Sequence, residues 1–524
     1  MSVVLGLDSS TQSLSAVLLD TQRGEILAED SVNFGKDLPQ YQQAHGYDES
    51  GIAGEVHANP MMWVEALDLL LSKMKAAGVD FSQVSSVSGS GQQHGSVYLK
   101  PCFGEKLASL DSSLDLKSQL NGCLTRASSP IWMDSSTSQQ CQEIAEAVGG
   151  NEIVCAKSGS IAVERFTGSQ IRKFAQTDPD AYAETGTIHL VSSYFASIMA
   201  GQNVGIDFGD GAGMNLMNLA EKDWDQDLLE ATAENLYDKL PMCVPSATQS
   251  GPIATYFVEK YGFSASCETI VWSGDNPCSL VGMGAASPGK VVISLGTSDT
   301  LFAAMPEPKT DPNGFGHVFG NPAGGYMSLI CFKNGSLARE AVKEKFDLEW
   351  SAFEKEALSQ SPLGNEGLMM LPFYEPEITP MMDLGGPVFS EAGDHSAKQS
   401  VRAVLEGQFL NMRVHSSWLG VDPERIYLTG GASENDGIAQ VIANVFGVSV
   451  DRLDVPGSAT IGAGMRAAHG LGEDLGKLEA MFSQPKEGRT IDPEIGAKDI
   501  YDTLIEQYQA FLVKAKTEGL SSES

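Results

Sequence analysis

Two short polar turns, each preceded by an apolar run, carry residues that could bind a phosphorylated nucleotide. The first apolar run, Val3 to Leu7, leads into Asp8 and then into the small polar residues Ser9 to Gln12. A carboxylate at the end of a buried strand can hold hydrated Mg²⁺, and turn hydroxyl and N–H groups can bind phosphate oxygens. The alternative is an ordinary β-hairpin whose turn faces water, because short motifs produce many false matches.

A second copy of this pattern favours the phosphate-binding interpretation. Residues 291–300, VVISLGTSDT, again run from a β-branched strand into a polar turn, and both copies begin with Val-Val. Gly296 allows a close backbone approach to a phosphate, and Thr297 and Ser298 add hydroxyl donors. The repeat predicts two similarly built domains, each of which presents a hairpin to a shared cleft.

Asp275 is the strongest candidate for a general base. The segment Val271 to Asn276 combines a short apolar strand, a glycine and a carboxylate that has no cation near it in the sequence. A carboxylate at the end of a strand in a cleft can accept the proton of a sugar hydroxyl. Asp275 could also cap a helix that begins at Asn276-Pro277, and the two roles are compatible.

Two further side chains could contact a hydroxylated ligand. His94 lies in SGSGQQHG, residues 88–95, directly after a short apolar strand, and a histidine that caps a loop is the alternative interpretation. Arg165 could reach a ligand oxygen in an otherwise acidic chain. Residues 205–213 are predicted to form a flexible polar loop. Its Asp207 and Asp210 could be taken for metal ligands, but we interpret them as turn residues.

The elements that must position these residues predict an α/β fold. Strands are predicted over 84–88, 131–134, 327–331 and 426–429, and helices between Asn59 and Gly78 and over 137–148, 399–418 and 437–446. Residues 100–130 lack clear periodicity and are predicted to be a surface insertion. The glycine pattern of residues 462–467 loosely matches a dinucleotide fingerprint, but no strand directly precedes it. We therefore predict a closely packed helix there.

Composition restricts the function and the setting. The chain has 524 residues, a length that predicts two to four domains, and 42% of the residues are hydrophobic, which is enough to form large cores. The Ser287-Pro288-Gly289 segment is the predicted connection between two domains, residues 1–286 and 287–524. A formal charge of −34 argues against nucleic acid and anionic membranes as partners. Eight scattered cysteines without zinc spacing, an N-terminal strand in place of a signal peptide, and the lack of a long apolar run predict a cytoplasmic protein.

Five segments resemble the FGGY family of carbohydrate kinases: DSSTQS at 8–13, QQHG at 92–95, Gly274-Asp275-Asn276, SLGTSD at 294–299 and TGGAS at 429–433. The similarity runs in order over nearly the whole chain. QQHGSVY, ERFTGSQI, SLGTSDTLF and CFKNGSL are most similar to the xylulokinase branch, nearer its eukaryotic type. The resemblance implies an α/β fold of two ribonuclease-H-like domains, of the actin and hexokinase type, that flank a cleft.

The resemblance also implies an activity, ATP-dependent phosphorylation of D-xylulose to D-xylulose 5-phosphate, with Asp275 as the general base. The implied sugar ligands are His94, Arg165, Asp275 and Asn276, and Asp8 would hold Mg²⁺. The implied ATP-binding residues are Thr11, Gln12, Gly296, Thr297, Ser298, Trp350, Gly430, Gly431 and Asn435, with Ser10 near the phosphates.

Several alternatives stay open at this point. The substrate could be another ketose or polyol, such as ribulose, gluconate or glycerol. The chain could also be a non-catalytic, ATP-driven switch of the actin-like class, or a dinucleotide oxidoreductase that uses residues 462–467. Family members are often dimers, so the resemblance is compatible with a homodimer.

Overall fold

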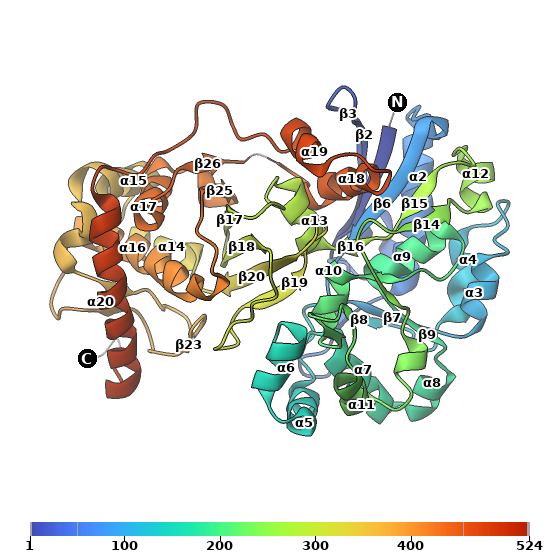
Figure 1. Ribbon diagram of the computed structural model, residues 1–524, viewed down its shortest axis with the longest axis horizontal. Helices are drawn as coiled ribbons and strands as arrows, with labels where there is room; N and C mark the ends of the chain where they lie inside the picture. Colours follow the sequence, from blue (N-terminus) through green and yellow to red (C-terminus); the bar gives the residue numbers. More distant parts are fainter. Residues whose placement is uncertain (1–2, 50, 454, 521–524) are drawn as a thin grey trace.

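Each half of the chain builds a β-sheet in which an antiparallel meander continues into parallel strands. The computed structural model describes residues 3–49, 51–453 and 455–520. The sheet of the first half lies on the right of Figure 1 and the sheet of the second half lies on the left. We call them the N-terminal and the C-terminal sheet. The repeated polar turn predicted from the sequence joins the first two strands of each sheet.

The N-terminal sheet has the strand order β14-β15-β6-β1-β2-β3, and β16 pairs with β6. Strand β2 is antiparallel to both of its neighbours, β1 and β3, whereas β6 runs parallel to β1, and β15 and β16 run parallel to β6. The bounds are β1 (Val3–Ser9), β2 (Ser13–Asp20), β3 (Glu25–Asn33), β6 (Val84–Gly91), β14 (Gln249–Pro252), β15 (Glu268–Ile270) and β16 (Ser273–Gly274).

The C-terminal sheet repeats this topology with the order β19-β20-β18-β17-β25-β26. Strands β17, β18, β20 and β19 are antiparallel neighbours, and β25 and β26 continue the sheet in parallel from β17. The bounds are β17 (Lys290–Leu295), β18 (Asp299–Met305), β19 (His317–Gly320), β20 (Tyr326–Phe332), β25 (Arg425–Thr429) and β26 (Val450–Arg452).

Helices cover the faces of both sheets. The helix predicted after Asn59 is α2 (Pro60–Ala76), in which the Asn59 side chain caps the Met61 N–H and a proline occupies the first turn. The other predicted helices are also present, with bounds shifted by a few residues. They are α5 (Ser138–Val148), α16 (Ala397–His415) and α17 (Asp436–Phe446). The second half of the chain also contains α14 (Ser336–Lys345) and α20 (Ala497–Glu518).

Helix α18 (Ser458–Gly470) comes late in the sequence but packs on the N-terminal sheet, where Figure 1 shows it beside β6 and α13 (Asp275–Gly282). A Cβ on Gly462 would lie 1.9 Å from the Cys278 carbonyl oxygen, and one on Gly282 equally close to the Ser458 oxygen. Only glycine permits backbones this close. The glycine pattern at 462–467 is therefore a helix-packing device, which confirms that prediction.

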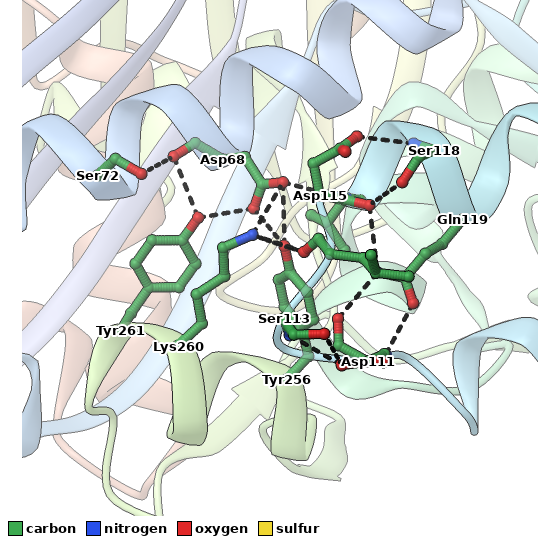
Figure 2. Close-up of polar contacts among 12 residues, drawn as sticks. Asp68, Ser72, Asp111, Ser113, Asp115, Ser118, Gln119, Tyr256, Lys260 and Tyr261 are labelled. Atoms are coloured by element: carbon green, nitrogen blue, oxygen red, sulfur yellow. Dashed lines mark hydrogen bonds and ion pairs between the residues drawn. The ribbon is translucent and has the colours of Figure 1, made fainter.

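The predicted insertion, residues 100–130, is ordered and anchored at its base. It contains α3 (Cys102–Leu107) and α4 (Leu116–Leu120), whose apolar side chains join the core around α2. Figure 2 shows part of the anchor, in which Asp68 of α2 accepts hydrogen bonds from the Tyr256 and Tyr261 hydroxyls of α12 (Thr255–Tyr261). Asp68 also accepts a hydrogen bond from the Leu116 backbone N–H. The Asp68 carboxylate thus joins α2, α12 and the insertion.

Two local predictions are wrong. Residues 131–134 form a turn and not a strand, since strand pairing stops at β8 (Ser129–Pro130) and Asp134 instead accepts from the Ser136 N–H and hydroxyl. Segment 205–213 is not a flexible polar loop: it folds as β10 (Ile206–Asp207) and α10 (Phe208–Gly211), with Asp207 and Asp210 about 1% exposed. Asp207 does act as a turn residue, because it caps the Asp210 N–H.

The helices of the described ranges include none that combines the length and the apolarity needed to cross a bilayer.

Candidate active site

The predicted metal ligand and the predicted base lie at one edge of the N-terminal sheet because three parallel strands end there in register. Asp8 of β1 is level with Ser90 of β6, and Ser90 is level with Ser273 of β16. Asp275 follows Ser273 by two residues and begins α13. Side chains at the carboxyl ends of neighbouring parallel strands converge, which is the usual location of ligand sites in such sheets.

Asp275 is partly buried at the sheet edge, and the loss of solvent around its carboxylate raises its pKa to about 6. Its Oδ1 accepts hydrogen bonds from the Asn276 backbone N–H at 2.9 Å and from Asn276 Nδ2 at 3.1 Å, and the backbone contact moderates the rise in pKa. Asn276 Nδ2 also donates to Gln93 Oε1 at 2.6 Å. A carboxylate with a pKa near neutrality can accept a proton and release it again, as a general base must.

Asp8 is the matching acidic group on β1. Burial and the charge of Asp275 raise its pKa to about 7. Its Oδ1 is buried and has no hydrogen-bond partner among the described residues. Within those residues, no three His, Cys, Asp or Glu side chains gather as a metal-binding group. A single free carboxylate oxygen fits Mg²⁺, which is usually held by one or two carboxylates together with water and substrate phosphates.

His94 has a fixed tautomer. Its Nδ1 lies 2.7 Å from the Gly213 carbonyl oxygen, which only accepts, so Nδ1 carries the proton and Nε2 is left as an acceptor. The ring stacks on Phe166 with centroids 4.1 Å apart, and the backbone adopts φ +70°. Burial and the nearby Arg165 lower its pKa well below the ordinary value. A neutral His94 can therefore accept a hydrogen bond from a ligand hydroxyl.

Arg165 approaches the same region from the start of α7 (Thr167–Thr177). Its guanidinium carbon lies 5.5 Å from the centre of the Phe166 ring, against which His94 also stacks. Its Nη2 donates to His317 Nε2 at 3.2 Å. The Phe166 ring thus brings the His94 imidazole and the Arg165 guanidinium together on one side of the site. We expect such an arrangement for residues that orient a small polar ligand.

The first of the two predicted phosphate-binding turns joins β1 to β2. The Ser10 N–H donates to the Ser13 carbonyl oxygen, and the Gln12 carbonyl oxygen accepts from the Phe34 N–H. Thr11 Oγ1 accepts a hydrogen bond from the Trp132 indole at 2.8 Å. The structure therefore orders this turn and leaves the Gln12 side chain exposed.

We call the parts of the molecule built around the two sheets the N-terminal and the C-terminal lobe. The second turn borders a cavity of about 520 Å³ in the C-terminal lobe. This cavity brings together five of the nine residues expected to bind ATP, namely Gly296, Thr297, Trp350, Gly431 and Asn435. Gly430 precedes Gly431 with φ +90°, and a Cβ there would lie 2.3 Å from the Leu295 oxygen. Ser298 is exposed beside the cavity, whereas Thr11 and Gln12 belong to the turn of the other sheet.

A buried ion pair holds this second turn from below. Arg339 of α14 contacts both carboxylate oxygens of Asp299, at 2.7 and 2.9 Å, and both side chains are almost fully buried. Gln408 of α16 accepts from Arg339 and donates to the Asn334 and Gly335 carbonyl oxygens. The Ser336 N–H donates to the Gly296 carbonyl oxygen at 2.9 Å. The turn is therefore fixed before any ligand arrives.

Sequence reasoning missed several residues of this site. Gln93, His317 and Trp132 each contact a predicted site residue, and Asp210 accepts from Ser192 beneath the sheet edge. The charge of Asp275 contributes to the strongly raised pKa of Asp210, after burial and the neighbouring Asp207. QQHG contained Gln93 as a visible signal, but nothing local in the sequence marks His317 or Trp132.

Comparison with known proteins identifies the family. The model of the FGGY family of carbohydrate kinases, N-terminal domain, matches residues 121–282, and that of the C-terminal domain matches residues 291–471. The chain belongs to the FGGY family of carbohydrate kinases. It is 43% identical to a xylulose kinase of Rattus norvegicus over 98% of this chain and 97% of the relative. Xylulose kinase 2 of Arabidopsis thaliana is also 43% identical, over 90% and 87%.

The fold of this FGGY kinase agrees with that of solved relatives. A xylulose kinase from Rhodospirillum rubrum superposes with a TM-score of 0.82 and 20% identity, covering 98% of this chain and 99% of that chain. The predicted fold, two ribonuclease-H-like domains of the actin and hexokinase type, is confirmed. The oxidoreductase alternative is excluded by the family and by the packing role of Gly462.

Proposed function

We propose that this FGGY kinase transfers the γ-phosphoryl group of ATP to the terminal hydroxyl of D-xylulose, giving D-xylulose 5-phosphate and ADP. The observation that carries the chemistry is the partly buried Asp275 carboxylate, whose raised pKa and Asn276 contacts suit a general base. The choice of sugar is supported by the 43% identity to xylulose kinases of a mammal and a plant.

The proposed reaction divides the work among groups at the edges of the two sheets. His94 Nε2 accepts a hydrogen bond from a sugar hydroxyl, while Arg165 donates to a sugar oxygen. Asp275 takes the proton of the attacking sugar hydroxyl. The sugar oxygen forms a bond to the γ-phosphorus, while the bond between the γ-phosphorus and the oxygen that leaves with ADP breaks. Phosphoryl transfer requires mainly positioning and charge stabilisation, which fixed turns supply without reorganisation.

The nucleotide is assigned to the 520 Å³ cavity, with its base near Trp350 and its phosphates at the Gly296–Ser298 turn. Thr11 and Gln12 contact the phosphates from the N-terminal sheet. Asp8 would hold Mg²⁺, and the bound ion would neutralise phosphate charge. The proposal also includes a cytoplasmic location and a homodimer, which cell fractionation and light scattering would test.

The deciding experiment measures ADP release with Mg-ATP across D-xylulose, L-xylulose, D-ribulose, L-ribulose, glycerol and D-gluconate. We expect a strong response to D-xylulose alone. A response to a different sugar would retain the mechanism and correct the substrate. Bound ATP with no response to any sugar would favour the actin-like switch. Asp275→Asn is the control for each active sugar, since its ADP release should fall to background.

A further inference from the structure

His317 belongs to the C-terminal sheet, yet its side chain reaches the sugar site of the N-terminal lobe. It begins β19, the edge strand that pairs only on its β20 side within the described chain. Its Nε2 accepts the hydrogen bond from Arg165 Nη2 at 3.2 Å. Arg165 and His317 thus connect the two lobes directly at a proposed sugar ligand.

The backbone of β19 is fixed against the N-terminal lobe at the same place. The Val318 N–H donates to the Gly159 carbonyl oxygen at 3.0 Å. Gly159 has φ +88°, and a Cβ there would lie 2.6 Å from the Val318 oxygen, so the approach requires glycine. Gly320 at the other end of β19 similarly abuts Phe208. The position of the imidazole is therefore set by main-chain contacts on both sides.

The protonation of His317 follows from its two partners. A guanidinium group has no acceptor, so Nε2 must accept the Arg165 hydrogen bond and the ring proton must sit on Nδ1. Nδ1 then donates to Ser160 Oγ at 3.0 Å. Burial and the Arg165 charge lower the pKa of His317 to about 3, which keeps the ring neutral near pH 7. The neutral ring is the form that can orient a cation.

Phe166 connects this contact to His94. Its ring centre lies 4.1 Å from that of His94 and 5.4 Å from that of His317. His317 also stacks with Phe319 of β19, with centres 6.2 Å apart. With one Arg165 nitrogen held by His317, the remaining guanidinium N–H groups have a defined direction. A restrained guanidinium loses less entropy when it binds a ligand.

We propose that His317 is a positioning residue that holds Arg165 from the C-terminal sheet so that its free N–H groups face the sugar. This inference rests on the proposed function, because it deepens the description of the same sugar site. It predicts a specific consequence: removal of the Nε2 acceptor should impair sugar binding and leave nucleotide binding unchanged.

Three substitutions at His317 test this prediction. His317→Gln keeps an acceptor near the Nε2 position, His317→Asn keeps only a partner for Ser160, and His317→Leu keeps neither. We expect KM for the sugar to rise about tenfold or more in the Asn and Leu variants, with KM for ATP within about twofold of the unmodified enzyme. The Gln variant should restore KM for the sugar to within about threefold.

His395→Asn, in the segment just before α16, is the matched control and should leave both KM values unchanged. The His395 ring forms a hydrogen bond with the Glu391 carbonyl oxygen and lies against the Phe389 ring, and neither residue belongs to the proposed site. Equal sugar KM values for the Gln, Asn and Leu variants would overturn the proposal. A parallel rise in both KM values would do so too, since it would indicate general distortion.

A second measurement is independent of the substrate. In the ligand-free protein, the imidazole nitrogen resonances of His317 should report a neutral ring protonated on Nδ1 between pH 6 and 8, and the Arg165→Leu variant should alter the Nε2 signal. A charged ring, or a proton on Nε2, would overturn the proposal. If the sugar panel identifies no substrate, the proposed function fails, while this measurement still decides the contact between His317 and Arg165.

Discussion

The charge of Asp275 raises the pKa of Asp8, although the two residues come from opposite ends of the N-terminal half of the chain. The relationship follows from strand register, which brings Asp8, Ser90 and Ser273 to one level across three parallel strands. Two carboxyl groups of like charge that share one poorly solvated site disfavour ionisation of each other. A cation near Asp8 and a substrate that donates a proton to Asp275 would reduce this repulsion. This expectation is consistent with the proposed roles of Asp8 in metal binding and of Asp275 as the base.

Substitution of Asp275 by asparagine should separate catalysis from folding. The amide preserves the shape but cannot accept the hydroxyl proton, so we expect kcat to fall about 100-fold or more while the dissociation constant for the sugar changes only modestly. Initial-rate kinetics and isothermal titration calorimetry would measure the two effects. Near-normal turnover would exclude Asp275 as the base.

The same substitution should not destabilise the protein at pH 8. Because the folded pKa of Asp275 is about 6 and its ordinary value is 3.8, the folded state binds its proton more tightly than the unfolded chain does. The stabilisation of the folded state by this proton is fully present below pH 3.8 and is lost as pH rises through 6. Asp275→Asn should therefore raise the free energy of unfolding at pH 8, by roughly 2–3 kcal/mol at most. Urea unfolding measures this, and a loss of stability at pH 8 would contradict the pKa argument.

Activity should depend on pH through the base. Only ionised Asp275 can accept a proton, so kcat/KM for the sugar should rise with pH through about 6 and level off above pH 7. The measurement requires saturating Mg²⁺ and a range of pH 5–8, with circular dichroism at each pH as the control for folding. A flat profile down to pH 5 would exclude a base with this pKa.

Asp8→Asn should weaken the response to magnesium. If Asp8 supplies a protein oxygen to Mg²⁺, the amide should raise the half-saturating Mg²⁺ concentration about tenfold at fixed ATP, and excess Mg²⁺ should restore part of the rate. Asp180→Asn, at an exposed helix start, is the matched control. An unchanged Mg²⁺ dependence in Asp8→Asn would remove Asp8 from the metal site.

Arg339→Leu should destabilise the C-terminal lobe and the ATP site together. It leaves the buried Asp299 carboxylate without its cation, which typically costs about 3–5 kcal/mol. The double variant Asp299→Asn/Arg339→Leu should recover a large part of that loss, because no buried charge is then unpaired. Thermal unfolding and KM for ATP would measure both effects; an additive double variant would contradict a direct pairing.

Gly462→Ala should be strongly destabilising, since its Cβ would meet the Cys278 carbonyl oxygen at 1.9 Å. Gly476→Ala, also within a helix, is the matched control because its nearest neighbour would be 3.4 Å away. Alanine at position 476 should stabilise by about 0.5–1 kcal/mol through helix propensity. Similar unfolding midpoints for the two variants would contradict the close packing of α18.

Features coded by adjacent residues could be predicted from the sequence. The repeated turns, the Asn59 cap of α2 and the strand-end position of Asp275 depend on neighbours in the chain, and the structure contains all of them. The apolar run Ile131 to Met133 before Asp134 predicts a strand, whereas in the structure the Trp132 indole donates a hydrogen bond to Thr11 Oγ1.

Long-range partners left no local pattern to detect. His317 and Arg165 lie in different halves of the chain, and their contact depends on how β19 seats against Gly159. The sequence around Asp207 and Asp210 predicts a flexible polar loop. In the structure both side chains are buried because they contact Ser192, Ser246 and Arg466, which the sequence around them does not reveal. Burial of polar residues through such pairing cannot be deduced from periodicity.

The packing of α18 on the N-terminal sheet has a consequence for how the protein is made. Strands β1, β2 and β6 leave the ribosome first, but the helix that covers Val17 and Leu19 is completed only at Gly470. The nascent chain therefore carries an uncovered apolar face through most of its synthesis. Truncated products that end before Ser458 would present that face to chaperones and proteases, so the N-terminal sheet is protected only after α18 has been synthesised.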